Sequence, residues 1–358
     1  MLPAIPADSR RLADVLSSAM AAFEGKSNPL QLQATRSALV VLIDGLGHAQ
    51  LARHRGHARA LGSGAGKSLV SGFPSTTAAA LTSLATGSLP GRHGIVGYDA
   101  LVPGVGVRNQ LRDWGREMDP ETYQRRDPLW RRRACAVVAE RKYAASGFTL
   151  ATLRGADYLG QDNLDARVEA AVQALRSHEL VYLYLPELDR VGHKHGVGSD
   201  EWVSTLEALD AHVGELARAT RGGMLVTADH GMIDVPKARH IVLGSALEGV
   251  QEMAGEARAR QLHLDDPDLA LDAVRELREE FEEVAWVATR DDLVASGWLG
   301  EVDAEVLPRI GDVLIAAKGT WAFYPDDNDP AMGMVGQHGS FTGDELRVPL
   351  ARFGDWAR

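Results

Sequence analysis

Carboxylate and imidazole side chains recur in short glycine-containing motifs that are spread over almost the whole chain. Four motifs carry them: Val-Leu-Ile-Asp44-Gly-Leu-Gly, Asp189-Arg-Val-Gly-His193-Lys-His-Gly, Thr-Ala-Asp229-His230-Gly-Met and Gly336-Gln-His338-Gly. Carboxylate oxygens and imidazole nitrogens suit zinc, and manganese accepts similar ligands. A fifth motif, Phe73-Pro-Ser-Thr-Thr77, adds hydroxyl groups that a metal ion can activate as nucleophiles. The set indicates a metal-dependent enzyme that acts on phosphate esters.

Each motif is weak by itself because it also has an ordinary structural interpretation. Asp44 could cap a following helix, and Asp229 with His230 could simply be hydrogen-bonded at a strand end. A loop histidine between glycines, such as His338, is usually solvated. Thr77 could be a helix N-cap, although a helix N-terminus also presents N–H groups to an anion. Only their combination favours a metal site.

Asp189 and His193 lie four residues apart, and we expect Gly192 and Gly196 to let the backbone turn tightly around them. A third candidate, His195, follows closely. We favour His193 as the metal ligand and expect His195 to lie behind the ligands or on the surface.

Strand and helix patterns alternate along the chain, and they predict where these motifs meet. Short apolar runs predict strands at 38–43, 68–73, 148–153, 180–185 and 224–227. Apolar residues at helical spacing predict helices at 78–85, 164–175 and 202–216. This order predicts an α/β fold in which a mostly parallel sheet is sandwiched by helices. Ligands bind beyond the carboxyl ends of such strands, where several of the motifs stand.

The pattern changes after about residue 240, where the motif chemistry almost disappears. A charged helix is predicted at 268–283 and a strand at 312–317. We expect residues 240–325 to form an inserted, smaller α+β cap, and residues 1–239 and 326–358 to form the metal-binding core. Because the chain must leave and return near the site, we expect the cap to cover it and to select the leaving group.

In this order the motifs resemble those of the alkaline phosphatase superfamily and, within it, of the nucleotide pyrophosphatase/phosphodiesterase (type I phosphodiesterase) family. The most specific stretch begins with Phe73-Pro-Ser-Thr-Thr77 and continues through Leu81-Thr-Ser-Leu-Ala-Thr-Gly87 to His93-Gly-Ile. The next is Asp-x-x-Gly-His-x-x-Gly at 189–196. The resemblance covers about residues 38–100, 180–235 and 330–350.

The resemblance implies an alkaline-phosphatase-like fold and two divalent metal ions, with zinc expected and manganese as the alternative. It implies that the ligands of the first ion are Asp44, Thr77, Asp229 and His230. It implies that the ligands of the second ion are Asp189, His193 and His338. It also makes Thr77 the nucleophile of phosphate-diester hydrolysis through a phospho-threonine intermediate. The substrate would be a small phosphate ester.

The chain departs from the family at one position near the nucleophile. Many nucleotide pyrophosphatases have an asparagine three residues after the nucleophile, where this chain has Ala80. The backbone N–H of Ala78 could partly replace its contact with the phosphoryl oxygens. Aromatic side chains of the segment 98–126, Tyr98 and Trp114 in particular, could enclose the leaving group.

Three other functions fit part of the pattern. A phosphomonoesterase or a phosphomutase of the same superfamily would use related ligands, and in a mutase Ser75 or Thr76 would be rival nucleophiles. A non-catalytic metal-binding protein would need the ligands alone. A sulfatase is disfavoured because its Cys/Ser-x-Pro-x-Arg signature is absent.

Charge and hydropathy limit the binding partners and the localisation that we expect. The net charge is −11, which argues against a nucleic-acid-binding surface because such a surface needs a basic stripe. No secretory signal is visible, and no apolar stretch approaches the roughly 18 residues expected of a membrane span. We therefore expect a soluble, cytoplasmic protein.

Overall fold

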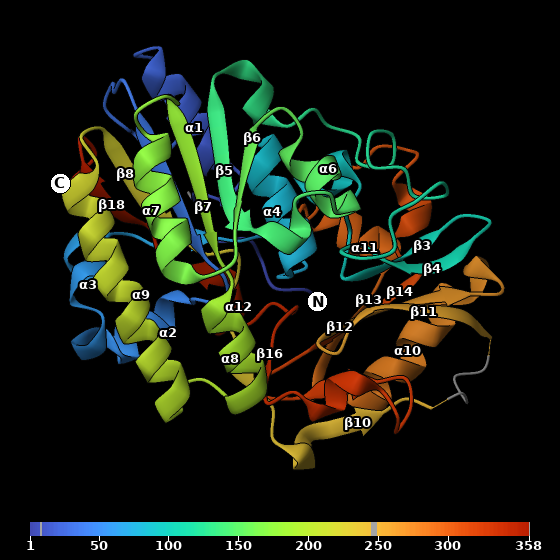
Figure 1. Cartoon of the computed structure of the whole chain (residues 1–358). Coiled ribbons are helices and arrows are strands. Elements are labelled where there is room, and N and C mark those ends of the chain that lie inside the picture. Colours follow the sequence, from blue (N-terminus) through green and yellow to red (C-terminus); the bar gives the residue numbers. More distant parts are fainter. Residues whose placement is uncertain (8, 245–248, 358) are drawn as a thin grey trace.

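The computed structural model, which describes residues 1–7, 9–244 and 249–357, is built on a six-stranded sheet with the order β18-β8-β1-β7-β5-β6 (Figure 1). Its strands are β1 Ala38–Ile43, β5 Cys135–Glu140, β6 Asp157–Gln161, β7 Leu180–Leu185, β8 Gly223–Thr227 and β18 Ala351–Gly354. Only β18 runs antiparallel to its neighbour, and the other pairs are parallel. The predicted, mostly parallel α/β sheet is confirmed.

The register of the central strands sets the position of the motifs. Ile43 of β1 pairs with Leu185 of β7, and Leu42 pairs with Thr227 of β8. All residues of β1 and β8 are buried, which explains their continuous apolar runs. Because the three strands end level with one another, the residues that follow them, Asp44 among them, leave the sheet at one edge.

Helices cover both faces of this sheet, with α7 and α9 in front of it and α1 and α4 behind it in Figure 1. They span α1 Asp14–Phe23, α4 Thr77–Thr86, α7 Leu164–Ala174 and α9 Asp200–Ala219. Leu16, Leu84 and Leu209 of these helices belong to one buried apolar cluster with the strands. The Ser199 side chain accepts a hydrogen bond from the Trp202 N–H, which caps α9. The three predicted helices are confirmed, with shifts of a few residues at their ends.

Two predicted strands are wrong in part or in whole. Residues 148–153 belong to the helix α6, Gly147–Leu153, whose first turn is capped by Ser146 through the N–H of Thr149. A short apolar run does not distinguish a strand from a buried helix, and the serine cap decides for the helix. Of residues 68–73, only Leu69–Val70 forms a strand, β2, and it pairs with β17, Arg347–Val348, outside the main sheet.

A second, antiparallel sheet with the order β11-β12-β14-β13 lies beside the first one (Figure 1). It consists of β11 Val250–Glu256, β12 Ala259–Leu264, β13 Ala285–Thr289 and β14 Val313–Ala317. The helices α10 Ala270–Phe281 and α11 Arg290–Ala295 accompany it. The predicted charged helix and the predicted strand at 312–317 are therefore present, and this part has α+β character.

The remaining elements are short. The helices are α2 His48–Arg53, α3 Arg59–Gly64, α5 Pro90–His93, α8 Glu187–His195 and α12 Gly343–Leu346. The strands are β3 Asp99–Val102, β4 Gly106–Asn109, β9 Ile233–Asp234, β10 His240–Val242, β15 Ala322–Tyr324 and β16 Gly336–Gln337. β16 pairs with β9, which brings the chain after residue 335 back to the edge of the main sheet. Within the described ranges, every helix is too short or too polar to cross a membrane.

Candidate metal centre

Six predicted metal ligands gather into two groups at the carboxyl edge of the main sheet. Asp44, Asp229 and His230 form what we call the first cluster, and Asp189, His193 and His338 form the second cluster. In each cluster, one oxygen or nitrogen from every residue lies within 4.8 Å of the others. Five segments that are far apart in sequence thus converge, and one of them carries Thr77.

The Nε2 atom of His230 lies near the other ligand atoms of the first cluster. It is 3.4 Å from Asp44 Oδ1, 3.5 Å from Asp229 Oδ2 and 3.1 Å from Thr77 Oγ1. Atoms that share one zinc ion at tetrahedral corners are separated by about 3.3 Å, because each bond is about 2.0 Å long. The observed separations match that spacing.

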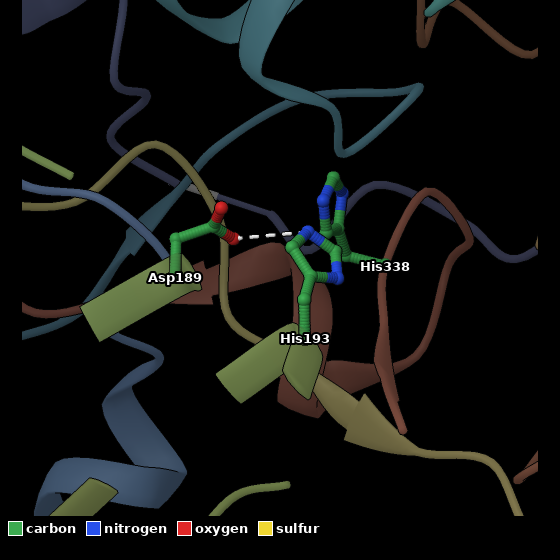
Figure 2. Close-up of side chains that lie close together, drawn as sticks. All are labelled: Asp189, His193 and His338. Atoms are coloured by element: carbon green, nitrogen blue, oxygen red, sulfur yellow. Dashed lines mark ion pairs between the residues drawn. The ribbon is translucent and has the colours of Figure 1, made fainter. Parts of the chain in front are cut away.

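The second cluster combines a helix and a loop, and its three side chains point toward one another in Figure 2. Asp189 and His193 stand one turn apart on α8, and Asp189 Oδ1 lies 3.3 Å from His193 Nε2. The predicted tight turn around Gly192 is wrong, since Gly192 lies within this helix and only Gly196 has a positive φ. The helix brings Asp189 and His193 together instead, because residues four apart lie on one face of a helix.

His195 lies outside the second cluster, and its Nδ1 is 3.6 Å from Glu201 Oε1 near the surface. His338 enters the cluster from the loop after β16. Its ring stacks on that of His230 with centroids 3.6 Å apart, so the two clusters are adjacent.

Each histidine of the two clusters has its Nδ1 fixed by a backbone carbonyl. His193 Nδ1 lies 2.7 Å from the Gly336 oxygen, His338 Nδ1 lies 2.9 Å from the Ser75 oxygen, and His230 Nδ1 lies 3.1 Å from the Gly231 oxygen. A carbonyl only accepts, so Nδ1 carries the proton and donates it. The lone pair of Nε2 is thereby left for a metal ion, which is the usual orientation of metal-binding histidines.

Hydrogen bonds also orient two of the carboxylates and leave one oxygen of each without a partner. Asp229 Oδ1 accepts from the N–H groups of Gly45 and His230, and Asp44 Oδ2 accepts from the Tyr184 hydroxyl. Their other oxygens, together with Asp189 Oδ1, are buried without a hydrogen-bond partner in the described part of the chain. Orphaned buried oxygens are costly, and a cation bound in each cluster would satisfy them.

The pKa shifts of the cluster residues also favour a bound divalent cation. Burial, with the neighbouring Asp229 and Asp189 carboxylates, raises the pKa of Asp44 well above its ordinary value, and burial also raises the pKa of Asp229. Burial and the nearby His230 and His193 lower the pKa of His338 well below its ordinary value. Acidic groups that resist ionising together, beside a histidine that resists protonation, form a site that a divalent cation would stabilise.

The predicted nucleophile and its neighbour lie at the start of α4. Thr77 is the first residue of this helix, and Ala78 is the second and is buried. The first N–H groups of a helix have no partner within it, so the Ala78 N–H is placed to bind an oxyanion. Thr76 is the N-cap residue, but its side chain makes no capping hydrogen bond.

The two aromatic residues that were predicted to enclose the leaving group, Tyr98 and Trp114, lie in different places. Tyr98 lines a cavity of about 350 Å³ whose lining also includes Thr77 and Asp44. Trp114 does not line it: its Nε1 donates to the Gln110 oxygen, and its ring packs edge-on against Tyr123 with centroids 5.9 Å apart. Trp114 therefore lies outside the lining of this cavity.

Two residues near the clusters were missed in the sequence. The Tyr184 hydroxyl of β7 donates to Asp44. Two tyrosines, Tyr182 and Tyr184, interrupt the otherwise apolar sequence of this strand, and this pattern could have indicated a polar role. Glu256 comes from the second sheet, and its Oε2 lies 3.8 Å from His338 Nδ1. Burial raises the pKa of Glu256 to about 8. No motif surrounds Glu256 in the sequence, so only the fold reveals it.

Comparisons with known proteins identify the family of the chain. Residues 38–341 match the family described as type I phosphodiesterase / nucleotide pyrophosphatase. No curated protein matches the chain in sequence.

Solved structures are similar in fold. Murine ectonucleotide pyrophosphatase / phosphodiesterase 5, an inactive threonine-to-alanine variant in complex with AMP, has a TM-score of 0.71 at 18% identity, with 89% of this chain and 88% of that chain covered. The human protein of that name has a TM-score of 0.71 at 17% identity, with the same coverages of 89% and 88%. Phosphonoacetate hydrolase from Sinorhizobium meliloti 1021, in complex with phosphonoformate, has a TM-score of 0.69 at 20% identity and coverages of 90% and 91%.

Proposed function

The chain belongs to the type I phosphodiesterase / nucleotide pyrophosphatase family of phosphoester hydrolases, and from that premise we propose that it hydrolyses phosphate diesters with two divalent metal ions and a threonine nucleophile. One observation carries the proposal: imidazole nitrogens and orphaned carboxylate oxygens gather in two adjacent clusters. The spacing of these atoms and their chemistry fit a metal ion in each cluster.

The first cluster with Thr77 would hold one ion, and the second cluster would hold the other. We propose zinc for both, because the ligands are nitrogen and oxygen atoms with near-tetrahedral spacing. Bound there, the ions would act as Lewis acids and lower the pKa of the Thr77 hydroxyl.

Thr77 and the Ala78 N–H then have separate roles in an in-line displacement at phosphorus. The Thr77 oxygen attacks phosphorus, the bond to the leaving alkoxide breaks, and a phospho-threonine forms. Water hydrolyses this ester and regenerates the Thr77 hydroxyl. The Ala78 N–H, at the positive end of α4, donates to the phosphoryl oxygen that gains charge. The inactive threonine variant among the structural neighbours supports a threonine in this role.

We propose the division into a core and an inserted cap of residues 240–325 on the basis of the two separate sheets. Glu256 of the second sheet reaches His338, so this segment contacts the second cluster. Asp312 makes an ion pair with Arg290 and accepts from the Leu264 N–H, which ties it into the second sheet rather than into the metal centre.

The experiment compares bis(p-nitrophenyl) phosphate with p-nitrophenyl phosphate as substrates of the protein purified without chelator. We expect faster release of nitrophenol from the diester, loss of activity with EDTA, and recovery with zinc or manganese. Preference for the monoester would favour a phosphomonoesterase. Two bound metals without turnover of either substrate would favour a mutase or a metal-binding protein.

A further inference from the structure

The loop that carries His338 is contacted by the second sheet. Residues 336–346 comprise the strand β16, His338 itself and the residues up to the end of α12. The strand β16 pairs with β9, which follows the first cluster in the chain. The turn between β11 and β12, and the end of β14, contact residues that come after His338. The inserted segment therefore supports a loop that bears a proposed metal ligand.

A buried ion pair is the central contact. Arg258 lies in the two-residue turn between β11 and β12. Its Nε donates to Glu345 Oε1 at 2.7 Å and its Nη2 donates to Glu345 Oε2 at 2.8 Å, and both side chains are 0% exposed. Arg258 also donates to the backbone oxygens of Trp321 and Gly319 in the inserted segment. Two parallel hydrogen bonds of this kind fix the orientation of the two elements as well as their distance.

The Glu345 carboxylate also holds the loop residues that follow His338. Its Oε1 accepts from the Ser340 N–H at 3.0 Å, and its Oε2 accepts from the Thr342 hydroxyl. The Ser340 hydroxyl donates to the Ala317 oxygen of β14 at 2.6 Å. Ser340 is thus tied to Glu345 and to the second sheet, and it stands only two residues after His338. A displacement of Ser340 would be passed on to His338 through the backbone.

The same turn approaches the loop at a second point. Gly339, directly after His338, has a φ of +132°, and a Cβ atom there would lie 2.7 Å from Glu256 Cδ at the end of β11. Because Gly339 has no side chain, the Glu256 carboxylate occupies this space, and its Oε2 lies 3.8 Å from His338 Nδ1. Residues 256–258 therefore contact the loop both beside His338 and at Glu345.

Stability alone does not account for a buried ion pair at this place. Removing two charges from water is costly, and buried ion pairs can often be replaced by apolar side chains of similar volume without loss of stability. A forked arginine–carboxylate pair provides a defined geometry in addition. Here that geometry sets the position of the His338 loop relative to the second sheet.

We infer that Arg258 and Glu345 are positioning residues of the second metal centre, which together hold the loop that presents His338 to the ion. The inference rests on the proposed function, because it requires an ion in the second cluster. It gives the inserted segment a part in metal binding, although the proposed ligands lie outside this segment. The Gly231 N–H, beside His230 of the first cluster, donates to the backbone oxygen of Glu345 at 2.8 Å, and this bond does not involve the carboxylate.

The test replaces the ion pair by two methionines. Arg258→Met/Glu345→Met removes both charges at similar volume, so no buried charge is left without a partner. We expect the melting temperature of the metal-free protein to change little. We expect the affinity for the second equivalent of zinc to fall about 10- to 100-fold, and the affinity for the first equivalent to stay unchanged. Competition with chelators of graded affinity measures both equivalents.

Amide hydrogen exchange of the metal-free protein examines the loop without any ion. We expect residues 336–346 to exchange at least about tenfold faster in the double variant, because the Ser340 N–H loses its acceptor. Arg260→Met/Asp329→Leu is the matched control, since Arg260 is a buried residue of β12 that donates to Asp329 at 2.8 Å, outside residues 336–346. The control should leave zinc affinity and the exchange of this loop unchanged.

A conservative variant keeps the test decisive if the double variant does not fold. Arg258→Lys retains the positive charge but loses the forked donor, so one ammonium group faces the two Glu345 oxygens. We expect it to weaken the second equivalent of zinc less than the double variant does, and to leave the first equivalent unchanged. Partial recovery with lysine would show that the charge and the fork both contribute.

The outcomes separate this inference from the proposed function. Unchanged affinity for the second equivalent in the folded double variant, or in Arg258→Lys if the double variant does not fold, would overturn the inference. Equal losses of both equivalents, or the same loss in the control pair, would also overturn it. Two bound ions without hydrolysis of bis(p-nitrophenyl) phosphate would overturn the proposed function and leave the inference in place. Fewer than two ions in the unmodified protein would refute the two-metal function, and faster exchange of residues 336–346 in the double variant would still support the ion pair as the anchor of the loop.

Discussion

The two ligand clusters differ in how the fold holds them. Asp44, Asp229 and His230 lie within three residues of the ends of two buried parallel strands, and their side chains are at most 3% exposed. The second cluster stands on one helix and one loop, with side-chain exposures of 15% for Asp189, 22% for His193 and 9% for His338. A buried, strand-anchored site is expected to hold its ion more firmly than a partly exposed one. We therefore propose that the first cluster holds its metal ion more firmly than the second cluster does.

The largest effect is expected at the proposed nucleophile, Thr77, which lies beside the first cluster. Thr77→Ala should lower turnover of bis(p-nitrophenyl) phosphate at least about a thousandfold, because it removes the attacking oxygen. Metal content should change little, since three ligands of the first cluster remain. Thr77→Ser should keep partial activity, and Thr76→Ala should be mild. An inactive Thr76→Ala beside an active Thr77→Ala would place the nucleophile one residue earlier.

A direct test of the comparison removes one ligand from the second cluster. His193→Ala should lose one equivalent of metal by elemental analysis and retain the other, because the first cluster is intact. Lys194→Ala is the matched control, since it changes the neighbouring residue of the same helix. Retention of both equivalents in His193→Ala, or loss of both, would contradict two separately held ions.

A smaller effect is expected from the hydroxyl that orients Asp44. Tyr184→Phe should weaken metal binding at the first cluster by about 10- to 100-fold, because the Asp44 carboxylate loses its donor. Tyr158→Phe removes a hydroxyl from the same cavity that bonds a backbone carbonyl instead, and it should leave metal affinity unchanged. Competition with a chelator of known affinity measures both variants, and equal behaviour of the two would refute the role of Tyr184.

The smallest effect concerns stability without metal. Burial raises the folded-state pKa of Asp44 and of Asp229, so the folded protein binds more protons than the unfolded one above pH of about 4. These two groups therefore make the metal-free protein lose stability as the pH rises from that value through their folded pKa values.

Asp44→Asn should flatten this loss in urea unfolding of EDTA-treated protein between pH 5 and 8, compared with the exposed control Asp327→Asn. It should also remove the stabilisation that zinc gives to the unmodified protein. An identical pH slope in both variants would show that the first-cluster carboxylates ionise normally without metal.

The difference between the clusters also explains what the sequence could predict. Asp44 and Asp229 follow clear apolar strands, and the rule that ligands gather beyond strand ends in a parallel sheet was enough to bring them together. For Asp189 and His193, the predicted ligands meet, but on a helix rather than in a turn. The resemblance to a known family linked both pairs to His338 and Thr77.

Other features depend on packing that a sequence pattern does not contain. The strands β5 and β6 were overlooked, and residues 148–153 were assigned to a strand although Ser146 caps a helix there. Glu256 approaches His338 across more than 80 residues of intervening chain, and the cavity is formed by side chains from α4, α6 and three strands. Such contacts arise only when elements that are distant in sequence pack together.

The most direct test of two adjacent metal ions is a crystal structure of the protein purified without chelator, with anomalous scattering recorded above and below the zinc edge. We expect two anomalous peaks separated by about 3.5–4 Å, one bounded by Asp44, Asp229 and His230 and the other by Asp189, His193 and His338. A single peak, or peaks elsewhere in a crystal of active protein, would contradict the two-metal site.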